Sequence, residues 1–246
     1  MRKDGGKCYV VGHHAVSVLL EHHPEQVKEL WLEHRVQLTD SQQQYLRRLG
    51  IAVQRMDGKW LEQRTGYERH QGWVAVVISV GALDEQTLWR LVESRGERLT
   101  LLVLDEVQDP HNLGACLRSA NAFGVDAVVL SRDRACGVTP VVTKAAAGAV
   151  ASTPLVAVSN LVRCLQQLKQ RGVWVYGADD QGDVELDAEL FSGPIALVFG
   201  SEGKGIRRLV REQCDQLFKI PMFGQVPCLN VSVAVGVGLY VACRRA

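Results

Sequence analysis

The stretch IALVFGSEGKGI, residues 195–206, joins an apolar segment to a turn that holds three glycines and one carboxylate, Glu202. Its first five residues have the composition of a buried strand. A dinucleotide-binding fingerprint would place such glycines directly after the first strand of the fold. Here they follow the penultimate predicted strand. The position disfavours a standard dinucleotide fold, and a tight strand-to-helix turn is the simplest interpretation.

Short apolar runs alternate with amphipathic segments from residue 99 to the C-terminus. The predicted strands span 101–105, 126–131, 154–158, 173–177, 195–200 and 216–220. The predicted helices span 113–123, 139–150, 160–171, 206–213 and 229–244. Strands that are apolar throughout and separated by helices indicate an α/β fold with a parallel sheet covered on both faces. The longest apolar run, 226–243, predicts a buried helix.

The chain before residue 79 has a different character, because six of the seven histidines precede residue 71. Predicted strands at 10–12, 29–32, 52–54 and 73–77 and helices at 15–21 and 40–49 describe a second, smaller α/β unit. The polar stretch between the two units predicts a linker that holds one short amphipathic helix. The expected organisation is therefore a domain at 1–78, a linker at 79–98 and a domain at 99–246.

Composition limits the class of protein. The 246 residues are 47% apolar, which is enough for a sizeable core, and a net charge of +1 leaves nucleic-acid binding to local basic patches. Seven cysteines without CxxC spacing argue against a disulfide framework or a zinc knuckle and favour a reducing cytoplasm. We expect no signal peptide and no membrane span. The pairs His13-His14 and His22-His23 lack further ligands, so we expect no metal.

The segment NLGACLRSA, residues 112–120, follows a predicted strand and opens a helix. Asn112 lies near the helix N-terminus, where capping is the common role of an asparagine. Arg118 lies in an otherwise apolar helix, and an arginine that faces a core needs an anionic partner.

The segment LNVSVA, residues 229–234, opens the last apolar helix. Asn230 and Ser232 lie where unpaired N–H groups and the positive end of the helix dipole can bind an anion or another ligand. A capped, buried helix explains these residues equally well, so this segment alone decides nothing.

The order NLGACLRSA, FGSEGKGI and IPM…LNVSVA resembles the three motifs of the SpoU, or TrmH, family of S-adenosylmethionine-dependent RNA ribose 2′-O-methyltransferases, in the SPOUT superfamily. The resemblance covers residues 99–245, and the three motifs in this order are far more specific than any one of them. One departure is Pro227-Cys228, where small hydroxyl residues are expected. This change would alter the cofactor loop without removing its backbone contacts.

The N-terminal segments GHHAV (12–16) and HQG (70–72) resemble the ribosomal-protein-like substrate-binding domain of the RlmB branch, which methylates a guanosine of large-subunit (23S) ribosomal RNA. Basic and aromatic residues in this part are candidates for contacts with phosphates and unpaired bases. They are Arg47, Arg48, Arg55, Lys59, Arg64, Arg69, Trp60, Tyr67 and Trp73.

The resemblance implies a SPOUT-type parallel sheet whose C-terminal segment forms a deep trefoil knot. It also implies S-adenosyl-L-methionine as the cofactor, held by backbone groups, with Met222 near the adenine. The corresponding cofactor-binding positions are Gly200, Ile220, Met222 and Leu229. The corresponding active-site positions are Asn112, Arg118, Glu202, Asn230 and Ser232.

Each active-site position has an expected role. A guanidinium is essentially never deprotonated, so Arg118 is assigned to the target phosphate and to lowering the pKa of the attacking hydroxyl, and the final proton acceptor stays open. Glu202 is assigned to orienting Arg118 or the ribose, with a helix cap as the alternative. Asn230 and Ser232 are assigned to positioning the nucleotide and the first motif.

The expected function is methyl transfer to a guanosine 2′-hydroxyl of 23S ribosomal RNA in the cytoplasm. Two alternatives remain open, which are methylation of a transfer-RNA ribose and a catalytically idle RNA-binding module of the same fold. We also expect a homodimer built on the last helix, in which Gly236 and Gly238 allow close packing.

Overall fold

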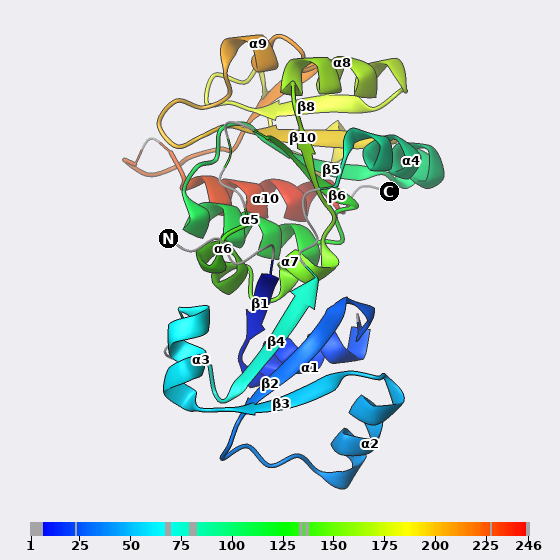
Figure 1. The fold of residues 1–246 in the computed structure, drawn as a ribbon. Coiled ribbons are helices and arrows are strands. Elements are labelled where there is room, and N and C mark those ends of the chain that lie inside the picture. The colour runs from blue at the N-terminus through cyan, green and yellow to red at the C-terminus, as the bar shows by residue number, and fades with distance from the viewer. Residues whose placement is uncertain are drawn as a thin grey trace.

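The computed structural model describes residues 7–22, 24–66, 70–78, 83–132, 135, 138–226 and 228–244, and these form two β-sheets (Figure 1). Expectations for His23, Tyr67, Arg69, residues 79–82 and Pro227 lie outside the described residues. None of the helices in the described ranges is long and apolar enough to cross a membrane.

The N-terminal sheet has four strands in the order β1-β4-β2-β3. Its strands are β1 (Lys7–Val11), β2 (Val27–Glu33), β3 (Ala52–Met56) and β4 (Trp73–Ile78), and β4 is antiparallel to both of its neighbours. Its helices are α1 (His13–His22), α2 (Asp40–Arg48) and α3 (Gly58–Thr65), with a 3-10 turn at Pro24–Gln26. The sequence predicts all of these elements except α3 and the turn, and the structure confirms a separate small α/β unit.

The second sheet has seven parallel strands in the order β7-β6-β5-β10-β8-β11-β9. They are β5 (Thr100–Leu104), β6 (Ala127–Ser131), β7 (Leu155–Val158), β8 (Trp174–Ala178), β9 (Val184–Glu185), β10 (Ile195–Phe199) and β11 (Gln216–Lys219). Six of them confirm the predicted strands. The seventh, β9, has two residues and is too short to give a pattern.

Helices cover both faces of this sheet, as its apolar strands predict (Figure 1). One face carries α5 (Pro110–Ala122), α6 (Pro140–Ala145), α7 (Ala149–Ser152) and α10 (Val231–Ala242). The other carries α4 (Glu85–Arg95), α8 (Leu161–Gln170) and α9 (Arg208–Arg211). Short 3-10 turns lie at Gly96–Arg98 and Ala188–Leu190.

The single helix predicted at 139–150 is wrong. The chain forms α6 and then α7, and between them Ala147 and Gly148 have φ angles of +49° and +94°. Left-handed backbone cannot continue a right-handed helix, so the helix stops and restarts. An isolated glycine in an apolar pattern did not signal this break.

The helix expected between the two units is α4, and it packs firmly on the second sheet. Leu88 and Val92 are buried against it, and Leu83 pairs with the edge strand β7 through hydrogen bonds of 2.6 Å to Leu155 O and 3.2 Å from Ala157 N. The described part of this connection therefore belongs to the packed surface of the sheet.

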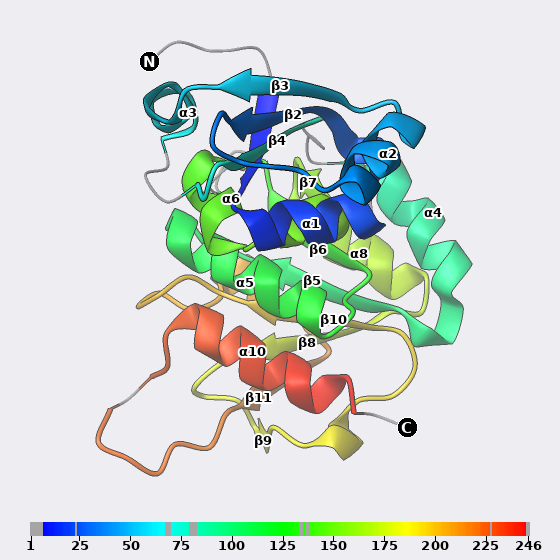
Figure 2. The ribbon, with the colours of Figure 1, turned by 90° about the horizontal axis from the view of Figure 1, so that it is seen from below.

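The last helix, α10, is buried on one face rather than all round. Val231, Val235 and Leu239 are buried, whereas Val233 and Tyr240 are 49% and 52% exposed. The helix lies beside α5 (Figure 2), and the half-exposed ring of Tyr240 contacts Phe123 and Arg244. The expectation of a fully buried helix is therefore wrong for the single chain, because an apolar sequence does not specify what covers each face.

Candidate active site

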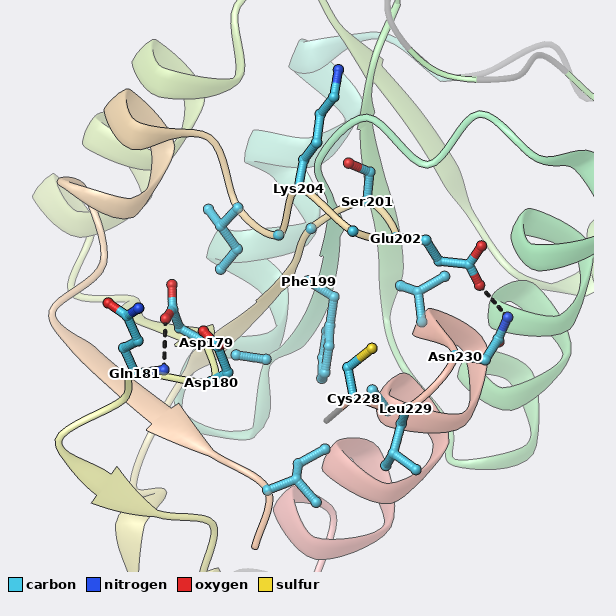
Figure 3. Close-up of a pocket in the computed structure, with 18 of the residues that line it drawn as sticks. Asp179, Asp180, Gln181, Phe199, Ser201, Glu202, Lys204, Cys228, Leu229 and Asn230 are labelled. Carbon is cyan, nitrogen blue, oxygen red and sulfur yellow. Dashed lines mark hydrogen bonds between the residues drawn. The ribbon is translucent and has the colours of Figure 1, made fainter. Parts of the chain in front are cut away.

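Three neighbouring parallel strands, β8, β10 and β11, end at the same edge of the seven-stranded sheet. The segments that follow them enclose a pocket of about 840 Å³ (Figure 3). Phe199, Ile220, Leu229, Val231 and Ala234 give it apolar walls. Its size and lining are typical of a small-molecule site, and ligands of open parallel sheets bind at this edge.

The glycine-rich loop after β10 folds back on itself. Ser201 N donates to Gly205 O over 3.2 Å, and Gly205 N donates to Ser201 O over 2.9 Å. A Cβ atom on Gly200 would lie 1.9 Å from the carbonyl carbon of Gly205, so the fold-back requires glycine there. The predicted tight turn is confirmed, and the same turn lines the pocket.

All four residues predicted to bind the cofactor line this pocket. They are Gly200, Ile220, Met222 and Leu229. Met222 is 41% exposed, at the start of the segment between β11 and α10 that extends away from the rest of the fold (Figure 2). Cys228 follows in the same segment and also lines the pocket.

Asn230 joins the three motif segments. Its Oδ1 accepts hydrogen bonds from Ser232 N over 2.9 Å and from the Ser232 hydroxyl over 2.6 Å, which caps α10. Its Nδ2 donates to Asn112 Oδ1 over 3.0 Å and to Glu202 Oε1 (Figure 3). Four of the five predicted active-site residues therefore form one hydrogen-bonded group, and two of them, Glu202 and Asn230, also line the pocket.

Asn112 is not the cap of α5, contrary to the simplest interpretation of the sequence. Pro110 occupies the first helical position, where its fixed φ angle suits the helix, and Asp109 caps the helix by accepting a hydrogen bond from His111 N over 2.9 Å. Asn112 is 8% exposed, and its side chain bonds to Asn230 instead. Asn112 therefore contacts the N-terminus of α10, through Asn230, rather than capping its own helix.

Arg118 is exposed, so it does not face the core of its own chain and does not need a buried anionic partner there. The buried stripe of α5 contains Leu113, Leu117 and Ala120, and Arg118 is rotated from Leu117 by one residue, about 100°. Within the described ranges its side chain makes no hydrogen bond or ion pair, and it does not line the pocket. The structure leaves Arg118 apart from the other four residues.

Glu202 contacts neither Arg118 nor the following helix, and its expected role in orienting the ribose stays a prediction. Its carboxylate bonds to Asn230 rather than to Arg118. It does not cap the following helix, because α9 begins after Arg207 and has no side-chain cap.

Sequence reasoning missed the polar end of the pocket. Asp179, Asp180 and Gln181 follow β8 and line the wall opposite Asn230 (Figure 3). Asp179 pairs with Arg211 Nε over 3.2 Å and accepts a hydrogen bond from Gln181 N over 2.9 Å. Two consecutive carboxylates just after a predicted strand were an available signal, because the carboxyl ends of parallel strands meet at one edge.

The N-terminal candidates for RNA contact differ in availability. Trp73 is 6% exposed and packs edge-on against His13 at 4.9 Å, so it cannot stack on a base. Trp60 is 39% exposed and lies edge-on to Trp31 at 5.1 Å. Arg55 donates to backbone carbonyls of the same unit.

No three His, Cys, Asp or Glu side chains in the described ranges lie together in a way that could hold a metal.

The described cysteines fall into two chemical groups. Burial raises the pKa of the Cys116, Cys164 and Cys214 thiols to about 12, which keeps them protonated. Cys228 and Cys243 are exposed, and of these two only Cys228 lines the pocket.

Comparison with known proteins agrees with this geometry. Residues 100–240 match the SpoU rRNA Methylase family, and residues 9–80 match the family described as RNA 2′-O ribose methyltransferase substrate binding. The chain is 45% identical over 242 residues to the 23S rRNA (guanosine-2′-O-)-methyltransferase RlmB of Pseudomonas putida, with 96% of each chain covered. It is 45% identical over 240 residues to the protein of the same name from Xanthomonas campestris, again with 96% of each chain covered.

A solved structure has the same fold. The SpoU methyltransferase AviRb from Streptomyces viridochromogenes, in complex with the cofactor AdoMet, superposes with a TM-score of 0.77 at 25% identity, over 97% of this chain and 90% of that one. The sequence match covers both α/β units, and the structural match covers them together. The chain therefore belongs to the SpoU rRNA methylase family.

Proposed function

We propose that this protein transfers a methyl group from S-adenosyl-L-methionine to the ribose 2′-hydroxyl of a guanosine in 23S ribosomal RNA. The observation that carries the proposal is the hydrogen-bonded link from Asn230 to Asn112 and Glu202, beside an apolar pocket. Relatives that are 45% identical over nearly the full chain are named for this reaction. With ribosomal RNA as substrate, the expected compartment is the cytoplasm.

The pocket has the chemistry that S-adenosylmethionine requires. Its apolar walls suit an adenine, and its loops bring backbone close to the ligand space. We assign cofactor hydrogen bonds to the backbone of Gly200, Ile220 and Leu229 and adenine contact to Met222. The bound cofactor supplies an electrophilic methyl group on a sulfonium.

The chain's own residues must orient the ribose and favour loss of its proton. The Asn112 side-chain oxygen accepts a hydrogen bond from Asn230. Its amide N–H groups donate to no described residue, so we assign them to donating a hydrogen bond to the ribose. Glu202 and Ser232 hold Asn230 in place from two sides. We assign Arg118, exposed on α5, to the target phosphate, where its charge lowers the pKa of the hydroxyl.

The test is to incubate the protein with labelled S-adenosylmethionine and either unmodified 23S ribosomal RNA or bulk transfer RNA, and to map ribose methylation. We expect label on one guanosine of the ribosomal RNA and none on transfer RNA. Label on transfer RNA alone would contradict the assignment of ribosomal RNA as the substrate. A protein that binds S-adenosylmethionine but labels neither RNA would be an idle member of the family. Asn112→Ala provides the inactive control.

We propose that residues 1–78 bind the RNA, that 79–98 connect the units, and that 99–246 form a methyltransferase domain closed by a deep trefoil knot. The path of the chain supports a knot. Strand β10 lies between β5 and β8, which both precede it in the sequence, and the chain then forms β11 on the other side of β8 before it crosses to α10, beside α5. Mechanical stretching from both ends tests it, because a knot traps chain and leaves an extension shorter than the contour length. Full extension would contradict it.

We also propose a homodimer built on α10. Val233 and Tyr240 are seven residues apart on one face of this helix and about half exposed, which leaves apolar surface open to solvent although Tyr240 also contacts Phe123 and Arg244. Gly238 does not serve this contact as expected, because a Cβ atom there would lie 2.6 Å from Phe199 Cζ within the same chain. The contact surface is therefore expected to consist of side chains rather than glycines.

A further inference from the structure

A buried carboxylate with no assigned role lies at the carboxyl end of β5. Asp105 is 0% exposed, does not line the pocket and is not part of any of the three motifs. A carboxylate is costly to bury unless it is paired and hydrogen-bonded. Its partners should therefore reveal what it does.

The Asp105 carboxylate binds one residue through three contacts. Oδ2 accepts a hydrogen bond from the backbone N of Arg207 over 2.9 Å. Oδ1 accepts from Arg207 Nε over 2.8 Å and pairs with Nη2 at 2.6 Å. These hydrogen bonds to Asp105 raise the pKa of the Arg207 guanidinium, so the charged pair is maintained.

The backbone of Asp105 holds a second residue. Its N–H donates to Phe199 O over 2.8 Å. Phe199 is the last residue before the glycine-rich loop, and Arg207 is the first residue after Ile206, which ends it. One residue of the neighbouring strand therefore binds both ends of the loop that carries Gly200 and Glu202.

The backbone beside Asp105 shows that this arrangement is imposed. Glu106 has a φ angle of +60°, a left-handed conformation that side-chain-bearing residues rarely adopt. Its carboxylate lies 3.5 Å from Arg207 Nε. Such conformations persist where the surroundings over-determine them, and they concentrate near functional sites.

We propose that Asp105 is a positioning residue that clamps both ends of the 200–206 loop and so fixes the cofactor pocket before the cofactor binds. This inference rests on the proposed function. A loop that is already ordered loses less conformational freedom on binding, so the clamp contributes to cofactor affinity. It touches neither the ribose nor the methyl group in this arrangement, so it contributes little to the rate at saturation.

The matched control is Asp126, a carboxylate that contacts the opposite, amino end of β5. Asp126 accepts a hydrogen bond from Thr100 N over 2.8 Å and pairs with Arg95 Nε at 2.8 Å, at the amino end of β5. Asp126→Asn therefore breaks a comparable carboxylate contact to the same strand, away from the loop. Asp105→Asn places an amide N–H against an N–H of Arg207, so it releases the Arg207 end of the loop and leaves the backbone hydrogen bond to Phe199 in place.

Calorimetric titration with S-adenosylmethionine and turnover at saturating cofactor are the readouts. For Asp105→Asn we expect the cofactor Kd to rise about tenfold or more while kcat changes by less than about threefold, because preorganisation acts on binding. Asp126→Asn should leave Kd within about threefold of wild type. Amide hydrogen exchange at Ser201 and Gly205 should accelerate in Asp105→Asn and not in Asp126→Asn.

A milder variant keeps the proposal testable if Asp105→Asn does not fold. Arg207→Lys retains the charge and the backbone N–H but loses the guanidinium fork, so its Kd should rise less than in Asp105→Asn. Unchanged Kd and unchanged exchange in both variants, or equal weakening by Asp126→Asn, would overturn the clamp. A wild-type protein that binds no S-adenosylmethionine would instead overturn the proposed function, and loop exchange would still test the clamp.

Discussion

Asn230 Nδ2 donates a hydrogen bond to Asn112 Oδ1 over 3.0 Å, which joins the N-terminal turns of two helices whose residues are 118 positions apart in the chain. The oxygen of the same Asn230 amide caps α10. In one side chain, Oδ1 therefore stabilises the helix, whereas Nδ2 contacts the other residues of the candidate active site. Substitutions that change one atom and keep the other can separate helix stability from activity.

Asn230→Asp keeps an oxygen for the cap and replaces the Nδ2 donor with a second oxygen. Aspartate caps helices about as well as asparagine, so the cap is kept and any fall in melting temperature should come from repulsion by Glu202, which is exposed to solvent. The new carboxylate would face Glu202 and Asn112 Oδ1 without a proton between them. We expect kcat/KM to fall by about 100-fold or more, measured by single-turnover methylation, because the oriented group is lost.

Asn230→Ala provides the comparison for this variant. It loses the cap as well as the donor, so its free energy of unfolding should fall by about 1 kcal/mol relative to Asn230→Asp, with activity equally low. An Asn230→Asp enzyme with near-normal turnover would show that the Nδ2 contacts are not needed for the reaction.

Gly200→Ala should abolish cofactor binding. A Cβ atom there would lie 1.9 Å from backbone carbon of Gly205, and backbone cannot rotate away as a side chain can. The loop must therefore open, and titration with S-adenosylmethionine should show no binding. Gly203→Ala is the control, because nothing lies within 4 Å of its Cβ position and its φ of +76° adds strain of about 1–2 kcal/mol.

Gly203→Ala should consequently keep cofactor binding at reduced stability. Equal binding by both variants would show that the loop does not border the cofactor.

The limits of prediction from sequence follow from particular residues. The apolar strands are local patterns and predicted the parallel sheet, whereas the four pocket residues were implied by the resemblance of the three motifs to a known family. Arg118 is exposed because it lies about 100° around α5 from buried Leu117, and an apolar helix pattern does not determine which side of the helix faces the core. The pair of Asp105 and Arg207 joins residues 102 positions apart, and neither the predicted strand that ends at Asp105 nor the predicted helix that contains Arg207 indicates their contact. Contacts of that range depend on strand order, which no single segment encodes.

Thiol alkylation should map the pocket. Cys116, Cys164 and Cys214 have pKa values of about 12 and should stay unmodified at about pH 8, because the thiolate is the reactive form. Exposed Cys228 lines the pocket and should react with iodoacetamide, more slowly once S-adenosylmethionine is bound. Exposed Cys243 is the internal control, since it does not line the pocket. Mass spectrometry that finds Cys228 unprotected by saturating cofactor would contradict the assignment of the pocket.

Arg118→Lys should reduce methylation without changing stability. The side chain is exposed and makes no hydrogen bond or ion pair within the described residues, so the melting temperature should match that of wild type. An ammonium retains the charge but cannot bind a phosphate with two parallel N–H groups, so kcat/KM for RNA should fall by about 10-fold to 100-fold. Cofactor Kd should not change. Near-normal kcat/KM would speak against guanidinium recognition of the phosphate.

Tyr240→Glu should convert the proposed dimer into a monomer. Tyr240 is 52% exposed on the outer face of α10, and Tyr240→Glu would remove its ring from the contact and introduce a charge. The new carboxylate can pair with exposed Arg244, four residues further on, but burying that pair in an apolar contact removes both charges from water. Light scattering after size exclusion should give the mass of two chains for the wild type and of one chain for the variant. Trp174→Glu is a matched control, because Trp174 is equally exposed, at 52%, but lies in β8 rather than on α10, and this variant should remain dimeric. A wild-type protein of single-chain mass with full activity would exclude the dimer.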